Sequence, residues 1–391
     1  MSDTFHDASH SYDSRSPIDK RVQPWRAWWP VVQRSNESGE DTENTKDSVL
    51  LSTDADAPWV KWRFNPEVPW EKPWIFWPLA WSPKYYGQAE IAPEVVHDQA
   101  FIEACLSLHS TSPAPISKYN PFRTTSTIQF FQDREGSEHE KPYACRVPVT
   151  SHSALQSNFH GKWQQIMLTD VRGHEDLFTL DKDGFEWFQH KTERTVADGD
   201  LDVLVYMKEM ARVIKERYKG SDVYIFDYVK RSPDKTDRWT GYSDVTRRVH
   251  ADQTPRSAIG RIKLHMKDRA DELLKKRCRI FSVWRPLLPV IEAYPLSAAS
   301  FTSVAPEDMV PIDVIYPHYA EESFEVRHNP NLRWYYKSAM TNEDIMVIKL
   351  YDNKMTDKTA YFAPHASWRD PAARKDAPPR RSIELRVMLF G

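Results

Sequence analysis

A histidine and an aspartate two residues apart, His250 and Asp252, are followed far along the chain by His365 and then by Arg380 and Ser382. In a β-strand, residues i and i+2 project to the same face, so His250 and Asp252 can aim at one point without bending the backbone. His365 must then arrive from a distant strand, which a double-stranded β-helix (jelly roll) permits. This spacing therefore predicts a mainly β chain with flanking helices and a jelly-roll core.

The residue types in this pattern suit a ferrous iron. Two imidazoles and one carboxylate on one octahedral face leave the opposite face open for a bidentate 2-oxoacid and for O2. Arg380 and Ser382 lie about one hairpin after His365, where they can bind the distal carboxylate of 2-oxoglutarate through charge-assisted hydrogen bonds. The formal charges of iron(II), Asp252, the dianionic cosubstrate and Arg380 then cancel, which suits a partly dry pocket. An iron(II) oxygenase is the leading hypothesis.

A histidine and an aspartate at this spacing also occur by chance, and the chain has a second copy at His174 and Asp176. The copy at His250 is favoured because the only R-x-S tripeptide of the sequence follows His365, and because strand-like segments surround both histidines. His174 stands in a charged, turn-rich segment, where we expect a solvated loop residue. An assortment of surface and core histidines is the alternative to a metal site.

Six segments of the chain occur in the order found in a family of fungal natural-product oxygenases. These segments are residues 249–255, 282–287, 334–336, 349–352, 362–365 and 380–386. The chain resembles this family, which includes the aspergillic-acid hydroxylase, the cephamycin 7-methoxylation component and the novofumigatonin endoperoxidase, over residues 125–391. The resemblance implies an Fe(II)/2-oxoglutarate-dependent dioxygenase of secondary metabolism, which also consumes O2.

By this resemblance, the catalytic residues and metal ligands are His250, Asp252 and His365, and Arg380 with Ser382 anchors the cosubstrate. It further implies that 2-oxoglutarate is converted to succinate and CO2 while hydrogen is removed from a bound apolar small molecule, a natural-product intermediate. We expect hydroxylation or desaturation. Cyclisation and endoperoxide formation stay open, because the outcome depends on how the substrate is positioned.

Which arginine pairs with the cosubstrate is open in the sequence. Arg381 occupies the middle of R-x-S, where the family often has an acid, so Arg380, Arg381 and Arg386 are all candidates. Arg285 is a further candidate for cosubstrate or substrate binding. It is equally well explained as a structural arginine beside a core residue, Trp284.

Two other classes of function compete with an oxygenase. A catalytically silent family member acting as a partner subunit or binding module would not need to keep three ligands. A metal-dependent hydrolase could use zinc on the same residues to generate hydroxide. Against the hydrolase, no carboxylate is obviously placed as a general base, and R-x-S would have no role.

Composition limits the remaining possibilities. The 391 residues with 40% hydrophobic content can form one large domain or one domain with an appendage. A formal net charge of −3 gives no reason to expect binding to nucleic acid or to an anionic membrane. Three cysteines without metal-ligand spacing favour a reducing compartment. We therefore expect a cytoplasmic protein and leave its oligomeric state open, homo-oligomers included.

The first third of the chain differs from the rest. Residues 1–20 predict a disordered tail and residues 36–47 an acidic loop. Around them lie two tryptophan clusters, the second interrupted by prolines that forbid a regular helix or central strand. We expect residues 1–124 to form a partly disordered extension packed on a jelly-roll oxygenase domain of residues 125–391. The indoles either cover apolar surface of that domain, which is favoured, or line a lid over the substrate, or bind carbohydrate or peptide.

Regular elements can be read coarsely in the second half. Apolar residues at helical spacing predict a helix over residues 202–218, and a cap residue before a proline predicts another over residues 254–276. Residues rich in β-branched and aromatic side chains predict strands over 223–229, 279–287, 360–368 and 382–390.

Overall fold

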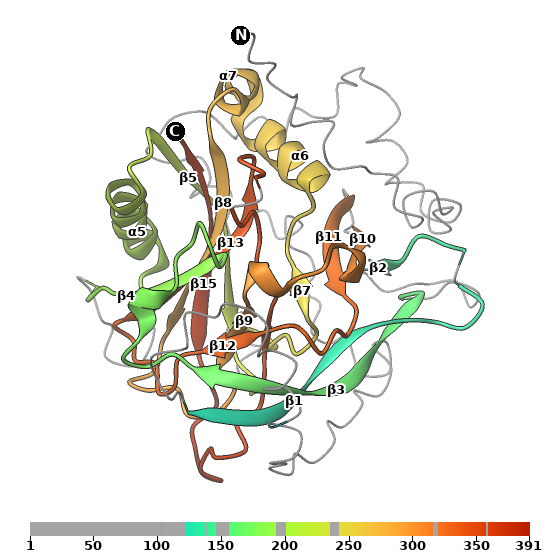
Figure 1. Cartoon of the computed structure of the whole chain (residues 1–391). Helices are drawn as coiled ribbons and strands as arrows, with labels where there is room; N and C mark the ends of the chain where they lie inside the picture. The colour runs from blue at the N-terminus through green and yellow to red at the C-terminus, as the bar shows by residue number, and fades with distance from the viewer. Residues whose placement is uncertain are drawn as a thin grey trace.

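The computed structural model describes residue 103 and residues 122–137, 139–145, 156–192, 201–234, 242–315, 320–356 and 359–391. Within these ranges the chain forms two β-sheets, one of nine strands and one of six. Three α-helices lie beside the sheets (Figure 1). The expected mainly β chain with flanking helices is confirmed.

The larger sheet combines strands that are far apart in the sequence, from β1 near the start of the described chain to β14 in its last third. In spatial order it comprises β1 (Arg123–Asp133), β3 (Phe159–Asp170), β12 (Trp334–Tyr336), β9 (Leu296–Ala299), β14 (His365–Ser367), β7 (His250–Ala251), β11 (Ala320–Val326), β10 (Met309–Ile315) and β2 (Tyr143–Cys145). The long antiparallel pair β1 and β3 forms one edge (Figure 1). The short strands β9, β14 and β7 lie side by side in the middle, where the predicted metal ligands are found.

The smaller sheet is built mainly from long buried strands. In spatial order it comprises β4 (Phe185–Gln189), β13 (Asp344–Asp352), β8 (Cys278–Pro286), β15 (Ser382–Phe390), β5 (Asp222–Arg231) and β6 (Tyr242–Ser243). The helices are α5 (Val203–Tyr218), α6 (Pro255–Met266) and α7 (Ala270–Leu274), and 3-10 turns lie at Glu175–Leu177, Lys267–Arg269, Phe301–Ser303 and Pro306–Asp308.

Helix α5 covers the outer face of the smaller sheet. On β15 it packs over the odd-numbered residues Ile383, Leu385, Val387 and Leu389, which share a core cluster with its own apolar residues. Because strand residues alternate between faces, the even-numbered residues of β15 project to the other side. There, Met388 and Phe390 join α6, α7 and residues of β9 in a second cluster. The polar residues Ser382, Glu384 and Arg386 therefore face the interior between the sheets.

Several predicted elements are confirmed and two are shorter than expected. α5 and β15 match their predictions, and the Asp202 side chain caps α5 by accepting from the backbone N–H of Leu204 and Val205. The helix predicted to reach residue 276 ends at Met266, because Lys267 adopts a positive φ of 46° and the chain continues as a 3-10 turn and α7. The strand predicted over 360–368 is limited to β14, since Pro364 has no N–H to donate.

Among the residues that the structure describes, no helix is both long and apolar enough to span a bilayer. The expected N-terminal extension, with its tryptophan clusters, falls outside the described ranges apart from residues 103 and 122–124.

Candidate metal centre

Three of the predicted residues converge at the middle of the larger sheet. His250 on β7 and His365 on β14 are direct cross-strand partners, and their ring centroids are 4.4 Å apart. Asp252 follows β7 by one residue, and its Oδ1 lies 3.3 Å from Nε2 of His250. One ligand atom from each side chain lies within 4.8 Å of the other two, and no other such group occurs in the described part of the chain. Pairing across the sheet thus brings distant residues to one point.

Backbone carbonyls determine which ring nitrogens face this point. Nδ1 of His250 lies 2.8 Å from the carbonyl oxygen of Arg248, and Nδ1 of His365 lies 3.1 Å from that of Ala363. A carbonyl oxygen only accepts hydrogen bonds, so each Nδ1 donates and a neutral ring keeps its lone pair on Nε2. Metal-binding histidines usually have this arrangement. Both imidazoles therefore fit a divalent metal through Nε2.

The protonation states of the group also suit a metal. Burial, followed by the nearby His250, lowers the pKa of His365 to about 4. Burial acts to raise the pKa of Asp252, but Arg386 and the two histidines hold that pKa well below its usual range. Metals bind neutral imidazole and ionised carboxylate. At neutral pH, neither His365 nor Asp252 has to release a proton first.

Arg386 orients the carboxylate of this group. Its Nε donates to Oδ2 of Asp252 at 3.0 Å, and its Nη1 donates to Oδ2 of Asp227 at 2.7 Å. The second aspartate balances the arginine, so the pair adds no net charge to the site. Asp252 is held with Oδ2 on the guanidinium and Oδ1 toward His250. The structure places Arg386 at the metal end of the site.

Arg380 supplies a buried and only partly satisfied cation. It is 1% exposed, and its Nη1 donates to the carbonyl oxygen of Tyr294 at 2.8 Å and to the hydroxyl of Ser367. Its Nε is buried without a hydrogen-bond partner, and its Nη1 donates to a carbonyl and a hydroxyl rather than to a carboxylate. The carboxylates of Glu384 and Asp244 attract it without a hydrogen bond. Burial, with help from Arg231, lowers the pKa of Arg380 to about 9. A buried guanidinium in this state fits an anionic ligand, which would supply the missing acceptor.

Two of the three metal ligands, His250 and His365, border the same pocket as this cation. The pocket is lined by Arg231, Thr246, His250, Ser282, Trp284, Leu296, His365, Ala366, Ser367, Arg380 and Glu384. The hydroxyl of Ser382, close in sequence to Arg380, is buried and lacks a hydrogen-bond partner. Ser382 is not itself among the lining residues, so Arg380 supplies the polar atoms that face the pocket and Ser382 a buried hydroxyl near it. A guanidinium with unused donors suits a ligand carboxylate, as in 2-oxoglutarate.

Glu384 is a pocket residue that was not predicted from the sequence. Its Oε1 accepts from the hydroxyl of Ser282 at 2.7 Å, and its Oε2 lies 3.7 Å from Nε of Arg231. Burial acts to raise its pKa, but Arg386 and Arg231 contribute to a net lowering, so the carboxyl is ionised. The signal available in the sequence was the alternation of Ser382, Glu384 and Arg386 along one strand.

Comparison with known proteins agrees with this geometry. A family model described as "Oxidoreductase/YMDC permease-like domain" matches residues 128–390. The Fe(II)/2-oxoglutarate-dependent dioxygenase nvfI of Aspergillus novofumigatus is 30% identical over 275 residues, covering 68% of this chain and 96% of the relative. The chain belongs to the family of Fe(II)/2-oxoglutarate-dependent dioxygenases. The hydroxylase/desaturase efuI of Hormonema carpetanum is 30% identical over 254 residues, covering 58% of this chain and 83% of the relative.

A solved structure extends the likeness to the fold. The iron and alpha-ketoglutarate-dependent endoperoxidase NvfI superposes with a TM-score of 0.61 at 26% identity, covering 69% of this dioxygenase and 98% of the endoperoxidase. The sequence resemblance to fungal oxygenases is therefore confirmed.

Arg285 of the dioxygenase lies away from the metal group. Its guanidinium donates to the hydroxyl of Tyr206 at 3.0 Å and to the backbone carbonyls of His190, at 3.0 Å, and Asn342, at 2.5 Å. Tyr206 belongs to α5, so Arg285 projects to the outer face of the smaller sheet. The neighbouring Trp284 projects inward and lines the pocket.

Arg381, the alternative cosubstrate anchor, and His174, the alternative metal ligand, are also not among the residues that line the pocket. Arg381 is half-buried and does not line the pocket. His174, of the second histidine and aspartate pair, is half-buried and precedes a 3-10 turn away from the metal group.

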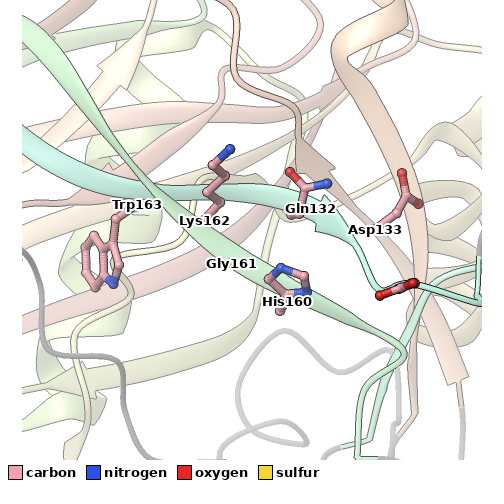
Figure 2. Close-up of a pocket in the computed structure, with 7 residues that line it drawn as sticks. Gln132, Asp133, His160, Gly161, Lys162 and Trp163 are labelled. Carbon is pink, nitrogen blue, oxygen red and sulfur yellow. The ribbon is translucent and has the colours of Figure 1, made fainter.

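A separate open pocket lies on the antiparallel pair of strands β1 and β3. Figure 2 shows its lining, which comprises Gln132, Asp133, Glu135, His160, Gly161, Lys162 and Trp163. None of the predicted site residues contributes to this pocket, and it holds no group of three ligand atoms among the described residues. The pocket at the middle of the larger sheet is therefore the candidate site.

A test of the arginine that orients Asp252 follows from its two hydrogen bonds. Replacing Arg386 with glutamine is expected to weaken the affinity for iron(II) by about 10–100-fold, as is usual for loss of an outer-shell partner of a ligand. Anaerobic titration with iron(II) measures the change. Arg374→Gln, on the exposed surface, is the control that should keep wild-type affinity. Equal affinities of the Arg386 variant and wild type would contradict the orienting role.

A buried lysine supports the segment that follows Asp252. Nζ of Lys141 lies 2.8 Å from Oδ1 of Asp313 and also contacts Glu322. Glu322 in turn accepts at 2.9 Å from the hydroxyl of Thr254, which caps α6. Strands β10 and β11 are thus joined to the start of α6 through one cation.

Replacing Lys141 with methionine is expected to lower the free energy of unfolding by about 3 kcal/mol. Buried Asp313 and Glu322 both lose the lysine charge, and Glu322 keeps only Arg256 of the described residues, at 3.5 Å, as a cation. Denaturant unfolding measures the loss. In the matched control Lys275→Met, the lysine pairs only with an exposed glutamate, so stability should hardly change. Equal free energies of unfolding for the two variants would refute the proposal that Lys141 stabilises the junction of β10, β11 and α6.

Proposed function

We propose that this dioxygenase oxidises an apolar small-molecule intermediate of natural-product biosynthesis by hydroxylation or desaturation, while 2-oxoglutarate is decarboxylated to succinate and CO2. One oxygen atom of O2 enters succinate, and the other enters the alcohol product or leaves as water. One observation carries the proposal: His250 and His365 of the metal-ligand group border one pocket with the partly satisfied guanidinium of Arg380. Relatives named hydroxylase/desaturase, such as efuI and poxK, support the type of reaction.

In this proposal His250, Asp252 and His365 hold iron(II), and Arg380 with Ser382 binds the distal carboxylate of 2-oxoglutarate. The bound iron and cosubstrate supply the oxidising power. The chain positions both and keeps water away from them. Arg386 fixes the direction of the Asp252 carboxylate, and the backbone carbonyls of Arg248 and Ala363 keep the histidine lone pairs directed at the metal.

We further infer that the two sheets are the walls of a double-stranded β-helix. The interior residues of β15 support this, since they pack between the smaller sheet and β9 of the larger one. The metal ligands of β7 and β14 then lie on one wall, and the anchor next to β15 lies on the other.

Anaerobic spectroscopy tests the proposed function. Wild-type protein supplied with iron(II) and 2-oxoglutarate is expected to develop the weak visible charge-transfer band of the iron chelate, and His250→Ala is expected to lack it. With O2 admitted, 2-oxoglutarate should be consumed and succinate formed. No band in wild type, or an equal band in the variant, would refute the assignment. Zinc-dependent ester hydrolysis without uptake of 2-oxoglutarate would favour a metal hydrolase.

A further inference from the structure

The candidate pocket contains a second arginine and a carboxylate beside Arg380. Arg231, at the end of β5, has a side chain 18% exposed, and its Nε lies 3.7 Å from Oε2 of Glu384, a carboxylate 8% exposed. Arg231 also acts on Arg380 by charge repulsion. The two arginines and one carboxylate therefore share one small, largely buried space.

Glu384 occupies the middle of this arrangement. On the inner face of β15, Glu384 lies between Ser382, next to the cosubstrate anchor, and Arg386, which contacts the metal ligand Asp252. Nε of Arg386 lies 3.9 Å from Oε1 of Glu384. Neighbouring residues on one face of a strand are about 6.5–7 Å apart. A cosubstrate reaching from the metal to Arg380 would pass this carboxylate.

We propose that Glu384 sets the charge of the pocket, and so limits its affinity for a dianionic cosubstrate, by pairing with Arg231. Arg380 is then the only lining cation of the described residues left to be neutralised. The inference rests on the proposed function. Formal charges support it, because Arg231 cancels Glu384 and Arg386 cancels Asp227. Iron(II), Asp252 and Arg380 then require two negative charges, which a 2-oxoacid with one distal carboxylate provides. A pocket of low polarity favours such exact compensation.

The arrangement also bears on product release. Succinate carries the same distal carboxylate as 2-oxoglutarate, so an additional cation near Arg380 would retain both. By cancelling Arg231, Glu384 limits the attraction that the departing dicarboxylate has to overcome.

A double-mutant cycle tests the pairing. Glu384→Gln keeps an oxygen acceptor for Ser282 but leaves the charge of Arg231 uncompensated, so the Kd for 2-oxoglutarate should fall about tenfold. Arg231→Gln leaves Glu384 facing the cosubstrate and should raise this Kd about tenfold. Both magnitudes correspond to one added charge at several ångströms in a medium of intermediate polarity. The double variant restores neutrality and should bind within about threefold of wild type.

The measurement is isothermal titration of manganese(II)-loaded full-length protein, which needs no turnover. 2-Oxobutyrate, which has the chelating head but no distal carboxylate, serves as the second probe, and its Kd should change by less than about threefold in either single variant. The Kd for succinate should change in the same direction as the Kd for 2-oxoglutarate in each variant. These results would establish that Glu384 acts on cosubstrate binding through the net charge of the pocket.

Other outcomes overturn the inference. A merely structural role for Glu384 predicts weaker binding of both oxoacids in Glu384→Gln, with no recovery in the double variant. If Glu384→Gln does not fold, Arg231→Gln decides, and an unchanged Kd for 2-oxoglutarate there would reject the pairing. Failure of the wild type itself to bind 2-oxoglutarate would refute the proposed function, which is a separate result.

Discussion

His365→Ala is expected to reduce the affinity for iron(II) by more than about 100-fold. Loss of an outer-shell partner already costs about 10–100-fold, and loss of a ligand costs more. The effect should be large because His365 is buried and contributes one of only three ligand atoms in the group. Anaerobic titration with iron(II) measures the affinity, and circular dichroism checks that the variant is folded.

The chain provides a matched control for this experiment. His174 belongs to the other histidine and aspartate pair of the sequence but lies outside the ligand group. His174→Ala should bind iron(II) as wild type does. If iron binding survived in His365→Ala and failed in His174→Ala, the assignment of the metal centre would be wrong.

Convergence of the ligands was predictable from strand geometry. The spacing of His250 and Asp252, and the need for a distant strand to deliver His365, predict one meeting point, and cross-strand pairing of the two histidines provides it. The boundaries of β15 were also predictable, because alternating residues and a strongly apolar face are local signals.

Which side of β8 faces the pocket could not be read from the sequence. All nine residues of this strand are buried, since α5 covers one face and the interior between the sheets covers the other. A strand buried on both faces lacks the polar and apolar alternation that identifies the solvent side. Trp284 and Arg285 are therefore indistinguishable as pocket residues until the register with β15 is known.

Glu384 was missed for a related reason. Its distance in sequence from Ser382 and Arg386 places all three on one face, but the function of a carboxylate there depends on Arg231, which lies on another strand. The break between α6 and α7 depends on the backbone conformation of one lysine, for which the sequence carries no strong signal. The boundary of the N-terminal extension stays a prediction.

Arg380→Gln is expected to weaken binding of 2-oxoglutarate by about 100-fold or more while leaving iron(II) affinity within about threefold of wild type. Removing one partner of a buried, hydrogen-bonded charge pair costs about 2–5 kcal/mol, and about 1.4 kcal/mol corresponds to tenfold in affinity. The iron ligands keep their own contacts, because Arg380 donates to Tyr294 and Ser367 and to none of the three. Titration of the manganese(II)-loaded protein with 2-oxoglutarate measures the loss.

Arg381→Gln is the control, because it removes the same charge from the adjacent residue, which does not line the pocket. Its affinity for 2-oxoglutarate should stay within about threefold of wild type. A larger loss in Arg381→Gln than in Arg380→Gln would move the anchor to the adjacent residue. We expect Arg380→Gln to lose affinity for 2-oxoglutarate but not for iron(II), and His365→Ala to lose affinity for iron(II). Together these results would show that the two ligands are bound by different residues. His365 and Arg380 border one pocket. A pocket that binds the metal at one end and the distal carboxylate at the other should respond to the two substitutions in this way.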